Sequence, residues 1–531
     1  MAEVVSYHRA VLAARPELYS PLPSRFIKPK VLACTLLGLG PLAGCVSINP
    51  KADLQRTSSL VTERTGSAEV YDPLADELAA EKVERLLADG LTIDQAVQVA
   101  LLNNPAFQAM FAEIGASRAD VVQSGLLSNP TVSVALMFPE GGGRSRLTAG
   151  FAQQIVDLWQ IPVRKKIAED QLEQTILSVA QRAVEQTAEV KSTCYQLLAL
   201  EQVIAVQREN RELADQSMQL VRRQYEAGLA NQFDVNLARV SVLDVDTELI
   251  QLERDREVTR SKLARLLGLS RYEKPWQLAD KIPLPDAIGE QRTLCEFAIQ
   301  KRLDAAAATF QVRSAEEELR LAALKVFPDL SLGTDMERME SRALPRRHIL
   351  ADTARESIAA GRLTAPSIQS RAQRAEEKRM IIDLVLGPSL AATLPIWDQN
   401  QAQIAKACFR AVQARKKFED LLDQVYEEVQ QTSQTARSDR QLLKFYNEQL
   451  LPQLQANVEA SRQIYLAGQQ SVLVLLDAQR SLVSRRKDYV NVLRDYALAM
   501  ADLERAVGGR LPSSTTTAPA SAPASSGPAR P

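Results

Sequence analysis

A run of 65 residues without proline or glycine, from Val163 to Ala227, constrains the fold of this 531-residue chain more than any other feature. The apolar residues that recur in it at alternating spacings of three and four are Ile176, Val179, Ala183, Val190, Cys194, Leu197 and Ile204. This period predicts an amphipathic helix of the coiled-coil type. At 1.5 Å per residue, such a helix would be roughly 97 Å long. Because no single globular core is that deep, the helix must lie against helical partners of comparable length.

The first partners follow directly in the sequence. After a bend at Gly228, a return helix is predicted over residues 232–268, and the proline-containing stretch 275–285 interrupts it. A further helix is predicted over 293–325. These two helices together are about as long as the outgoing one, so they can cover its length.

The second half of the chain repeats this plan. An outgoing helix is predicted over 399–467, with an irregularity at Pro452, and a return helix over 471–507. Its missing partner is the segment 92–126 at the start of the chain. The sequence is therefore interpreted as two copies of one unit, closed by joining the first helix to the last.

Four short segments between the predicted helices alternate apolar residues with small or polar ones. These segments are 131–138, 146–156, 329–336 and 384–395. They predict strands with one apolar face, so each half reads helix, two strands, long helix, tip turn and return helix. Such strands suit a tilted membrane crossing, where the open edges of a four-stranded sheet would leave peptide groups unpaired. We therefore expect other copies of the chain to complete the wall; strands of an ordinary soluble sheet are the alternative.

The two predicted tip turns share one pattern. The stretch YEAGLANQFDV returns in the second half as YLAGQQSVLVL. Gly228 and Gly468 permit backbone conformations that let two helices reverse direction. Asn231 and Ser471 follow at equal spacing, where each can cap the returning helix. A turn at the far end of so long a helix would lie well away from a membrane crossed by the predicted strands.

The N-terminus is typical of a bacterial lipoprotein signal. A basic cluster precedes the apolar run VLACTLLGLGPLA, and Leu-Ala-Gly-Cys ends at Cys45. Residues 1–44 are accordingly interpreted as a removed signal region, Cys45 as the lipidated residue and 45–91 as a lipid-anchored N-terminal segment. Val46 follows the cysteine where an inner-membrane lipoprotein carries aspartate, which favours the outer membrane. A short anchor that is never cleaved is the alternative.

Charge and composition argue against several classes of function. The 64 Lys and Arg and the 65 Asp and Glu are interspersed, so no basic surface for nucleic acid is predicted. Only two histidines occur, His8 and His348, and no Cys-x-x-Cys spacing is present. We therefore expect no catalytic residues, no metal site and no cofactor. Cys194, Cys295 and Cys408 are interpreted as small apolar residues inside helices.

The order of the elements and the tip sequences together resemble the TolC family of outer-membrane efflux factors, in particular its lipoprotein branch. The stretches that carry the resemblance, between Thr92 and Gly508, are LTIDQAVQVALLNNP, SNPTVSV, FPDLSLG, GPSLAATLPIWDQNQAQIAKA, YEAGLANQFDVNLARV and YLAGQQSVLVLLDAQRSLV. The resemblance implies a mainly α fold with a small β part, in two repeats, 92–290 and 291–510. It implies a homotrimer with a 12-stranded outer-membrane β-barrel, continued by a periplasmic α-helical barrel. The implied partners are a periplasmic adaptor and an inner-membrane pump of the RND type.

The resemblance also implies where docking and gating take place. The residues implied in adaptor docking at the two tips are Gly228, Leu229, Asp234, Val235, Ala238, Arg239, Gly468 and Ser471. At the periplasmic gate, Asp477 matches one of two acidic positions that attract cations in family members, whereas Val474 occupies the other. Val474 or Leu473 would then form an apolar constriction. Gln470 stands where some members carry a basic residue that latches the closed tip.

Two segments depart from the common pattern. Residues 337–380, between the third and fourth strands, carry ten Arg or Lys and six Asp or Glu. They predict an extracellular loop, either a variable surface loop or a basic lid that contacts anionic lipopolysaccharide. Residues 511–531 are rich in Pro, Ala, Ser and Thr and predict a disordered tail.

The expected function is that of a passive exit duct in the outer membrane, which conducts small substrates delivered by a partner pump. A non-conducting, lipid-anchored periplasmic coiled-coil scaffold is the alternative; it would explain the helices and Cys45, but not four strands between long helices. The sequence does not indicate whether metal ions, drugs or peptides are exported.

Overall fold

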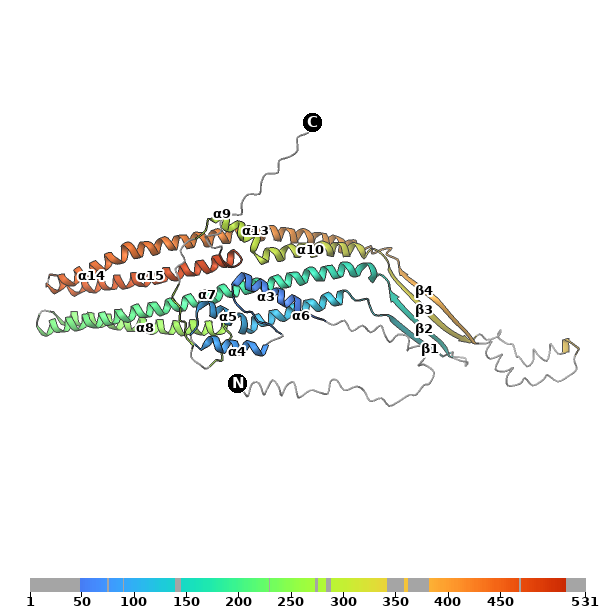
Figure 1. The fold of residues 1–531 in the computed structure, drawn as a ribbon, viewed down its shortest axis with the longest axis horizontal. Coiled ribbons are helices and arrows are strands. Elements are labelled where there is room, and N and C mark those ends of the chain that lie inside the picture. Colours follow the sequence, from blue (N-terminus) through green and yellow to red (C-terminus); the bar gives the residue numbers. More distant parts are fainter. Residues whose placement is uncertain are drawn as a thin grey trace, which may run out of the picture. The chain divides into compact units, whose positions relative to one another are not determined.

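The computed structural model describes residues 48–73, 76–88, 90–138, 145–228, 230–272, 276–282, 288–340, 358–361, 382–467 and 469–511. Most of these residues are helical, and the strands form one small sheet (Figure 1). The predicted signal region, Cys45, the tail beyond residue 511 and most of the 337–380 segment lie outside the described residues. Among the described helices, none combines the length and the apolar character needed to cross a membrane.

The two halves of the chain follow the predicted order of elements. The first half contains α3 (Lys51–Thr65), α4 (Asp76–Leu87), α5 (Ile93–Asn103), α6 (Pro105–Ser124), β1 (Thr131–Met137), β2 (Arg146–Gln154), α7 (Asp157–Glu226) and α8 (Gln232–Leu266). The second half contains α9 (Gln291–Lys301), α10 (Leu303–Leu324), β3 (Asp329–Glu340), β4 (Ile382–Thr393), α13 (Gln401–Phe445), the π-helical turn Tyr446–Leu450, α14 (Leu451–Leu466) and α15 (Val472–Ala506). The mainly α fold with a small β part is thus confirmed.

Helix α7 is the long helix that the proline-free run predicts. It has 70 residues and begins at Asp157, whereas the predicted run began at Val163, so Pro162 lies inside the helix. Its buried residues extend from Asp157 to Val221, and it packs against α3, α5, α6, α8, α10 and α15. Figure 1 shows that one end of α7 meets the sheet and the other reaches the turn into α8. The expected helical partners are therefore present along its length.

Two helices that were expected to be continuous are each broken in the structure. The segment 92–126 divides at Asn104, which has an extended backbone and whose side chain accepts hydrogen bonds from the N–H groups of Ala106 and Phe107. Pro105 disfavours a helical conformation at the residue before it, which explains this break. The segment 293–325 divides at Arg302, also extended, with φ −66° and ψ 126°. No proline accounts for that second break; the reason is the buried position of Arg302, described below.

The irregularity expected at Pro452 is confirmed and lies in the turn before it. Residues Tyr446–Leu450 form a π-helical turn, in which the N–H of Leu451 donates to the carbonyl of Tyr446. Proline has no N–H to continue the α-helical pattern, so the backbone widens where that bond is missing.

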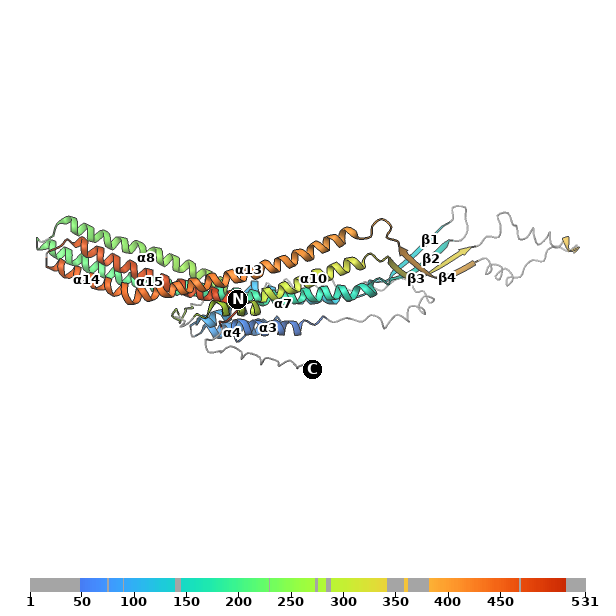
Figure 2. The same cartoon turned by 90° about the horizontal axis from the view of Figure 1, so that it is seen from above.

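The four predicted strands form one antiparallel sheet in the order β1-β2-β3-β4 (Figure 1). Figure 2 shows that this sheet lies at the opposite end of the helices from the tip of α8. β3 continues to Glu340, four residues beyond its predicted end and into the segment expected to be loop. Apolar residues on one face are largely exposed, including Val132 at 70%, Val134 at 69% and Leu386 at 71%. Among the described residues, β1 and β4 each leave one edge unpaired.

The N-terminal segment adds helices that the sequence analysis did not predict. The guanidinium of Arg118 on α6 donates to both carboxylate oxygens of Asp53 on α3, at 2.6 and 2.5 Å. At the other end of α3, the N–H of Arg510 donates to the carbonyl of Arg64 at 3.2 Å. These contacts hold α3 to both the first and the last parts of the described chain.

The three cysteines of the helical region do not share one environment. Cys194 on α7 and Cys295 on α9 are buried, as expected for small apolar residues, and burial raises the pKa of the Cys194 thiol to about 12. Cys408 lies on α13 but is exposed. No group of three or more metal-ligating side chains occurs among the described residues.

Candidate functional site

The first tip is a glycine turn followed by a capped helix. Gly228 ends the turn after α7 with φ +74°, and a side chain built there would meet nothing within 4 Å. Asn231 Oδ1 accepts from the N–H of Asp234 at 2.9 Å, while the carboxylate of Asp234 accepts from the N–H of Asn231 at 3.2 Å. This reciprocal capping box fixes the start of α8, as predicted for Asn231. Asp234 therefore has a structural role at this tip that the sequence analysis had not assigned.

The second tip has the same plan with a different cap. Ser471 Oγ accepts from the N–H of Leu473 at 3.1 Å, which starts α15. The hydroxyl of Tyr465, near the end of α14, donates to Gln224 of α7, so the second hairpin is tied to the first. Leu229 and Gly468, both implied in docking, lie outside the described residues.

The two tips share a small apolar cluster formed by Val221, Ala238, Tyr465, Val472, Leu475 and Leu476. Ala238 is only 1% exposed, and Val235 packs against the same cluster. The resemblance had implied docking roles for both residues. The structure places Ala238 between the hairpins and leaves Val235 partly buried beside it, whereas Gly228 and Arg239 are exposed. Ala238 and Val235 thus shape the tip from inside.

Phe233 is a tip residue that the sequence analysis missed. It lies in the first turn of α8 and is 71% exposed, next to the capping residues. Aromatic side chains, phenylalanine included, are enriched in interfaces with protein partners. The sequence could have indicated that Phe233 is exposed. The buried residues of α8, such as Ala238 and Val242, recur every three or four positions, and Phe233 does not fall in that series.

The implied gate residues lie at the start of α15 and just before it. Leu473 and Val474 precede Asp477 by four and three residues, which places these three on one side of α15, whereas Gln470 precedes the N-cap residue Ser471. All four are exposed, Leu473 at 54% and Val474 at 44%. Their neighbours Val472, Leu475 and Leu476 point into the apolar cluster instead. The face is therefore available to line a passage.

Above the tips, polar contacts join the two hairpins. Glu248 of α8 accepts from Gln207 of α7 at 2.8 Å and from Lys487 of α15 at 2.5 Å. Arg480 of α15 pairs with Asp244 of α8 at 3.5 Å. These residues line a cavity of about 190 Å³ between α7, α8 and α15. The hairpins are thus joined here by hydrogen bonds and ion pairs, in contrast to the apolar cluster at the tips.

Asp439 of α13 has a partly buried carboxyl group whose pKa is raised. One carboxylate oxygen of Asp439 is buried without a hydrogen-bond partner among the described residues, and burial together with the charge of Asp495 raises its pKa above 3.8. The folded chain therefore holds this proton more tightly than the unfolded chain does. The resulting stabilisation is complete below pH 3.8 and is lost as pH rises through the folded pKa.

Asp439→Asn should therefore raise the unfolding temperature at pH 7 by a few degrees at most and have little effect near pH 3. Thermal unfolding followed by circular dichroism at the two pH values would measure this. Asp423→Asn, at an exposed aspartate of the same helix, is the control. A lower unfolding temperature for Asp439→Asn at pH 7 would show that the carboxylate makes a favourable contact instead.

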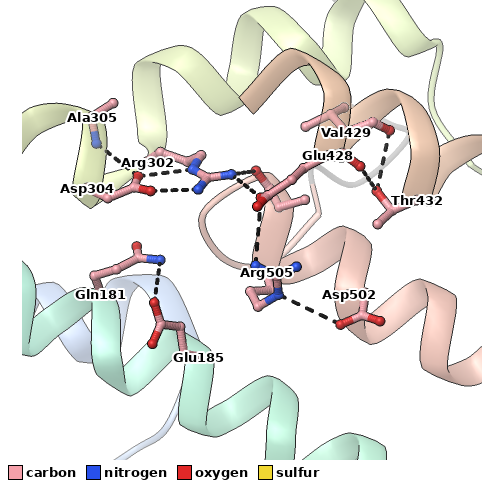
Figure 3. Close-up of polar contacts among 11 residues, drawn as sticks. Gln181, Glu185, Arg302, Asp304, Ala305, Glu428, Val429, Thr432, Asp502 and Arg505 are labelled. Atoms are coloured by element: carbon pink, nitrogen blue, oxygen red, sulfur yellow. Dashed lines mark hydrogen bonds and ion pairs between the residues drawn. The ribbon is translucent and has the colours of Figure 1, made fainter. Parts of the chain in front are cut away.

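A buried arginine joins three helices of the second repeat at the break between α9 and α10. Figure 3 shows Arg302 between Asp304 of α10, Glu428 of α13 and the end of α15. Its guanidinium donates to Asp304 at 3.0 and 2.6 Å, to Glu428 at 2.6 Å and to the carbonyl of Ala506 at 3.3 Å. The side chain is 5% exposed. Burial disfavours its charge, but the hydrogen bonds and charges of Asp304 and Glu428 outweigh burial and raise the pKa of Arg302.

Comparison with known proteins agrees with this architecture. A curated relative, the pyoverdine export outer membrane protein OpmQ of Pseudomonas aeruginosa, is 25% identical over 485 residues, covering 82% of this chain and 92% of its own. The solved structure of CusC has a TM-score of 0.63 at 16% identity and covers 80% of this chain and 94% of its own. The outer-membrane channel OprN has a TM-score of 0.62 at 18% identity, covering 86% and 95%.

The sequence model of the family described as outer membrane efflux protein matches residues 96–269 and 294–509, which is most of the chain. The two matched segments correspond to the two halves of the fold, each with its strand pair and its tip. The chain therefore belongs to the outer membrane efflux protein family and functions as an outer-membrane efflux channel.

Proposed function

We propose that three copies of this chain form a closed duct through the outer membrane, which passively conducts substrates delivered through a periplasmic adaptor by an inner-membrane pump of the RND type. The observation that carries the proposal is the sheet, because its apolar face is exposed and β1 and β4 each leave an unpaired edge among the described residues. In lipid, each unpaired peptide group costs several kcal/mol, so β4 of one copy would pair with β1 of the next. Three sets of four strands make a 12-stranded barrel, an even number of the size found in outer membranes.

The outer helices support assembly into a ring. α8 packs against α7 and leaves Val240, Leu243, Ile250 and Val258 at least half exposed. On α13, Phe409 and Val412 are exposed by 75% and 50%. Apolar rows of this extent are expected to be covered by a partner. α8 lies in the tip half of the molecule and the start of α13 lies near the sheet (Figure 1), so each row would meet its own surface on a neighbouring copy in a closed ring.

The N-terminal segment supports attachment to the membrane through Cys45. Residues 48–50 lead into α3, and Ile48 is 52% exposed. α3 itself is fixed by the ion pair of Asp53 with Arg118 and by the pair of Arg56 with Glu173. A lipid on Cys45 would thus precede, by a few residues in the sequence, a helix that is held to α6 and α7.

The tips are proposed as the adaptor-docking and gating end. Gly228, Asn231 and Phe233 present an exposed surface that the capping box holds in place, and Arg239 follows on the same helix. In a closed ring, Leu473 and Val474 would form the apolar constriction and Asp477 the remaining acidic ring. Gln470 supplies no positive charge for a latch, so closure would rest on contacts between apolar side chains.

A photo-crosslinker at two positions of α8 would test the assembly in the native bacterium. At Gln232, exposed beside the first tip, we expect capture of a periplasmic adaptor. At Ile250, which is 70% exposed, we expect capture of a second copy of this chain. The purified oligomer should conduct ions in a lipid bilayer. Absence of both captures together with absence of conductance would instead support a non-conducting scaffold.

A further inference from the structure

One row across the sheet contains a carboxylate between two glycines. Ser133 of β1, Gly150 of β2, Asp335 of β3 and Gly387 of β4 are in register with one another. Alternation along the strands places this row on the face opposite to the apolar row of Val134, Ala149, Met336 and Leu386. If the apolar face contacts lipid, Asp335 faces the interior of the barrel.

The two glycines make room for this side chain in different ways. A Cβ atom built at Gly150 would lie 2.5 Å from Oδ1 of Asp335 and 2.8 Å from Oγ of Ser133. The carboxylate therefore occupies the space that any other residue at 150 would fill. On the other side, a Cβ atom at Gly387 would meet nothing within 4 Å. Asp335 is exposed and accessible from the β4 side, so a hydrated ion can approach it closely.

Asp335 is also distinguished by the charges around it. On the same face, Arg146 of β2 forms an ion pair with Glu337 of β3, so these two charges compensate each other. Asp329, at the start of β3, lies on this face too. Among the described residues no ion pair is formed by Asp335. The interior face thus has a net negative charge in the described strands, with Asp335 well inside β3.

We propose that Asp335 is a residue that makes the membrane part of the duct selective for cations, an inference that rests on the proposed trimeric barrel. Three copies of the chain would place three carboxylates around the passage, and rings of acidic side chains select cations. Substitutions on the interior face of a barrel tune its selectivity. The tip retains one acidic position, Asp477, with Val474 at the other, so the barrel and the tip would contribute separately.

The test is the reversal potential of the full-length protein in a planar lipid bilayer under a KCl gradient. Asp335→Asn should lower the potassium-to-chloride permeability ratio by roughly threefold near 0.1 M salt, where the Debye length is about 10 Å. The difference should shrink at 1 M, where the Debye length is about 3 Å. Asp335→Glu keeps the charge and should keep the ratio. The same comparison in a protein that also carries Asp477→Asn separates the contribution of the barrel to the permeability ratio from that of the tip.

The outcomes distinguish this inference from the function that it assumes. A protein that conducts, with the same ratio for Asp335→Asn in both backgrounds, would overturn the role of Asp335 and leave the duct intact. If Asp335→Glu lowers the permeability ratio as much as Asp335→Asn does, the effect is structural, and the role of Asp335 is also overturned. A protein that does not conduct at all would contradict the duct itself. A fall confined to Asp335→Asn and weakened by salt is the expected result.

Discussion

Arg302→Met should lower the free energy of unfolding by about 3–5 kcal/mol, the usual cost of removing one partner from a buried charge cluster. The variant would leave Asp304 and Glu428, whose side chains are 25% and 35% exposed, without their shared cation. The carbonyl of Ala506 would also lose a donor. Denaturation of the detergent-solubilised protein, followed by circular dichroism, would measure the change.

The control for this prediction is Arg85→Met on α4. Arg85 pairs with Glu81 at 2.6 Å, but the two side chains are 70% and 61% exposed, so its loss should cost about 1 kcal/mol or less. A triple variant that also makes Asp304→Asn and Glu428→Gln should recover part of the stability, because no uncompensated carboxylate then remains. Equal losses for Arg302→Met and Arg85→Met would contradict a central role for Arg302.

Phe233→Asp should abolish most of the efflux activity without reducing the amount of oligomer in the membrane. If Phe233 is an anchor for the adaptor, its loss should cost about 2 kcal/mol or more of binding, roughly a 30-fold weaker complex. Phe233 is 71% exposed and makes no part of the apolar cluster between the hairpins, so the fold should tolerate the change. The measurements are export of a pump substrate by cells and crosslinking to the adaptor from Gln232.

Phe233→Leu is the matched control, because it keeps an apolar side chain at the same site and should retain most of the export. Full export with Phe233→Asp would show that the adaptor binds elsewhere on the tip. Loss of the oligomer itself would place Phe233 in contacts between copies of the chain instead.

Periodicity was sufficient to predict the long elements. The proline-free run around α7 and the alternation in β1 to β4 gave the correct type and order, because each pattern extends over many residues and reports one buried face. Pro452 correctly predicted a helix irregularity, because proline lacks the backbone N–H whatever the rest of the fold is. The break at Asn104 could also have been predicted, since Pro105 follows it and Asn is a good capping residue.

The break at Arg302 could not have been predicted from local sequence. It depends on Glu428 and on the carbonyl of Ala506, which are distant in the chain and approach only in the folded state. At the tips, the spacing of Ala238, Val242 and Val245 already indicated a buried face of α8. The contact of Ala238 with Tyr465 and Leu475 of the other hairpin forms only in the folded chain, so local sequence could not predict it.

The π-helical turn before Pro452 makes the two hairpins of one chain inequivalent. An inserted residue rotates everything beyond it by about 100° around the helix axis, because an α-helix has 3.6 residues per turn. α13 packs against α9, α10 and α15, whereas α14, beyond the turn, packs against α15. α7 passes the corresponding region without such an insertion. The outgoing helix of the second repeat therefore changes phase on its way to the tip, so a duplicated sequence plan yields two hairpins whose outgoing helices differ within one chain.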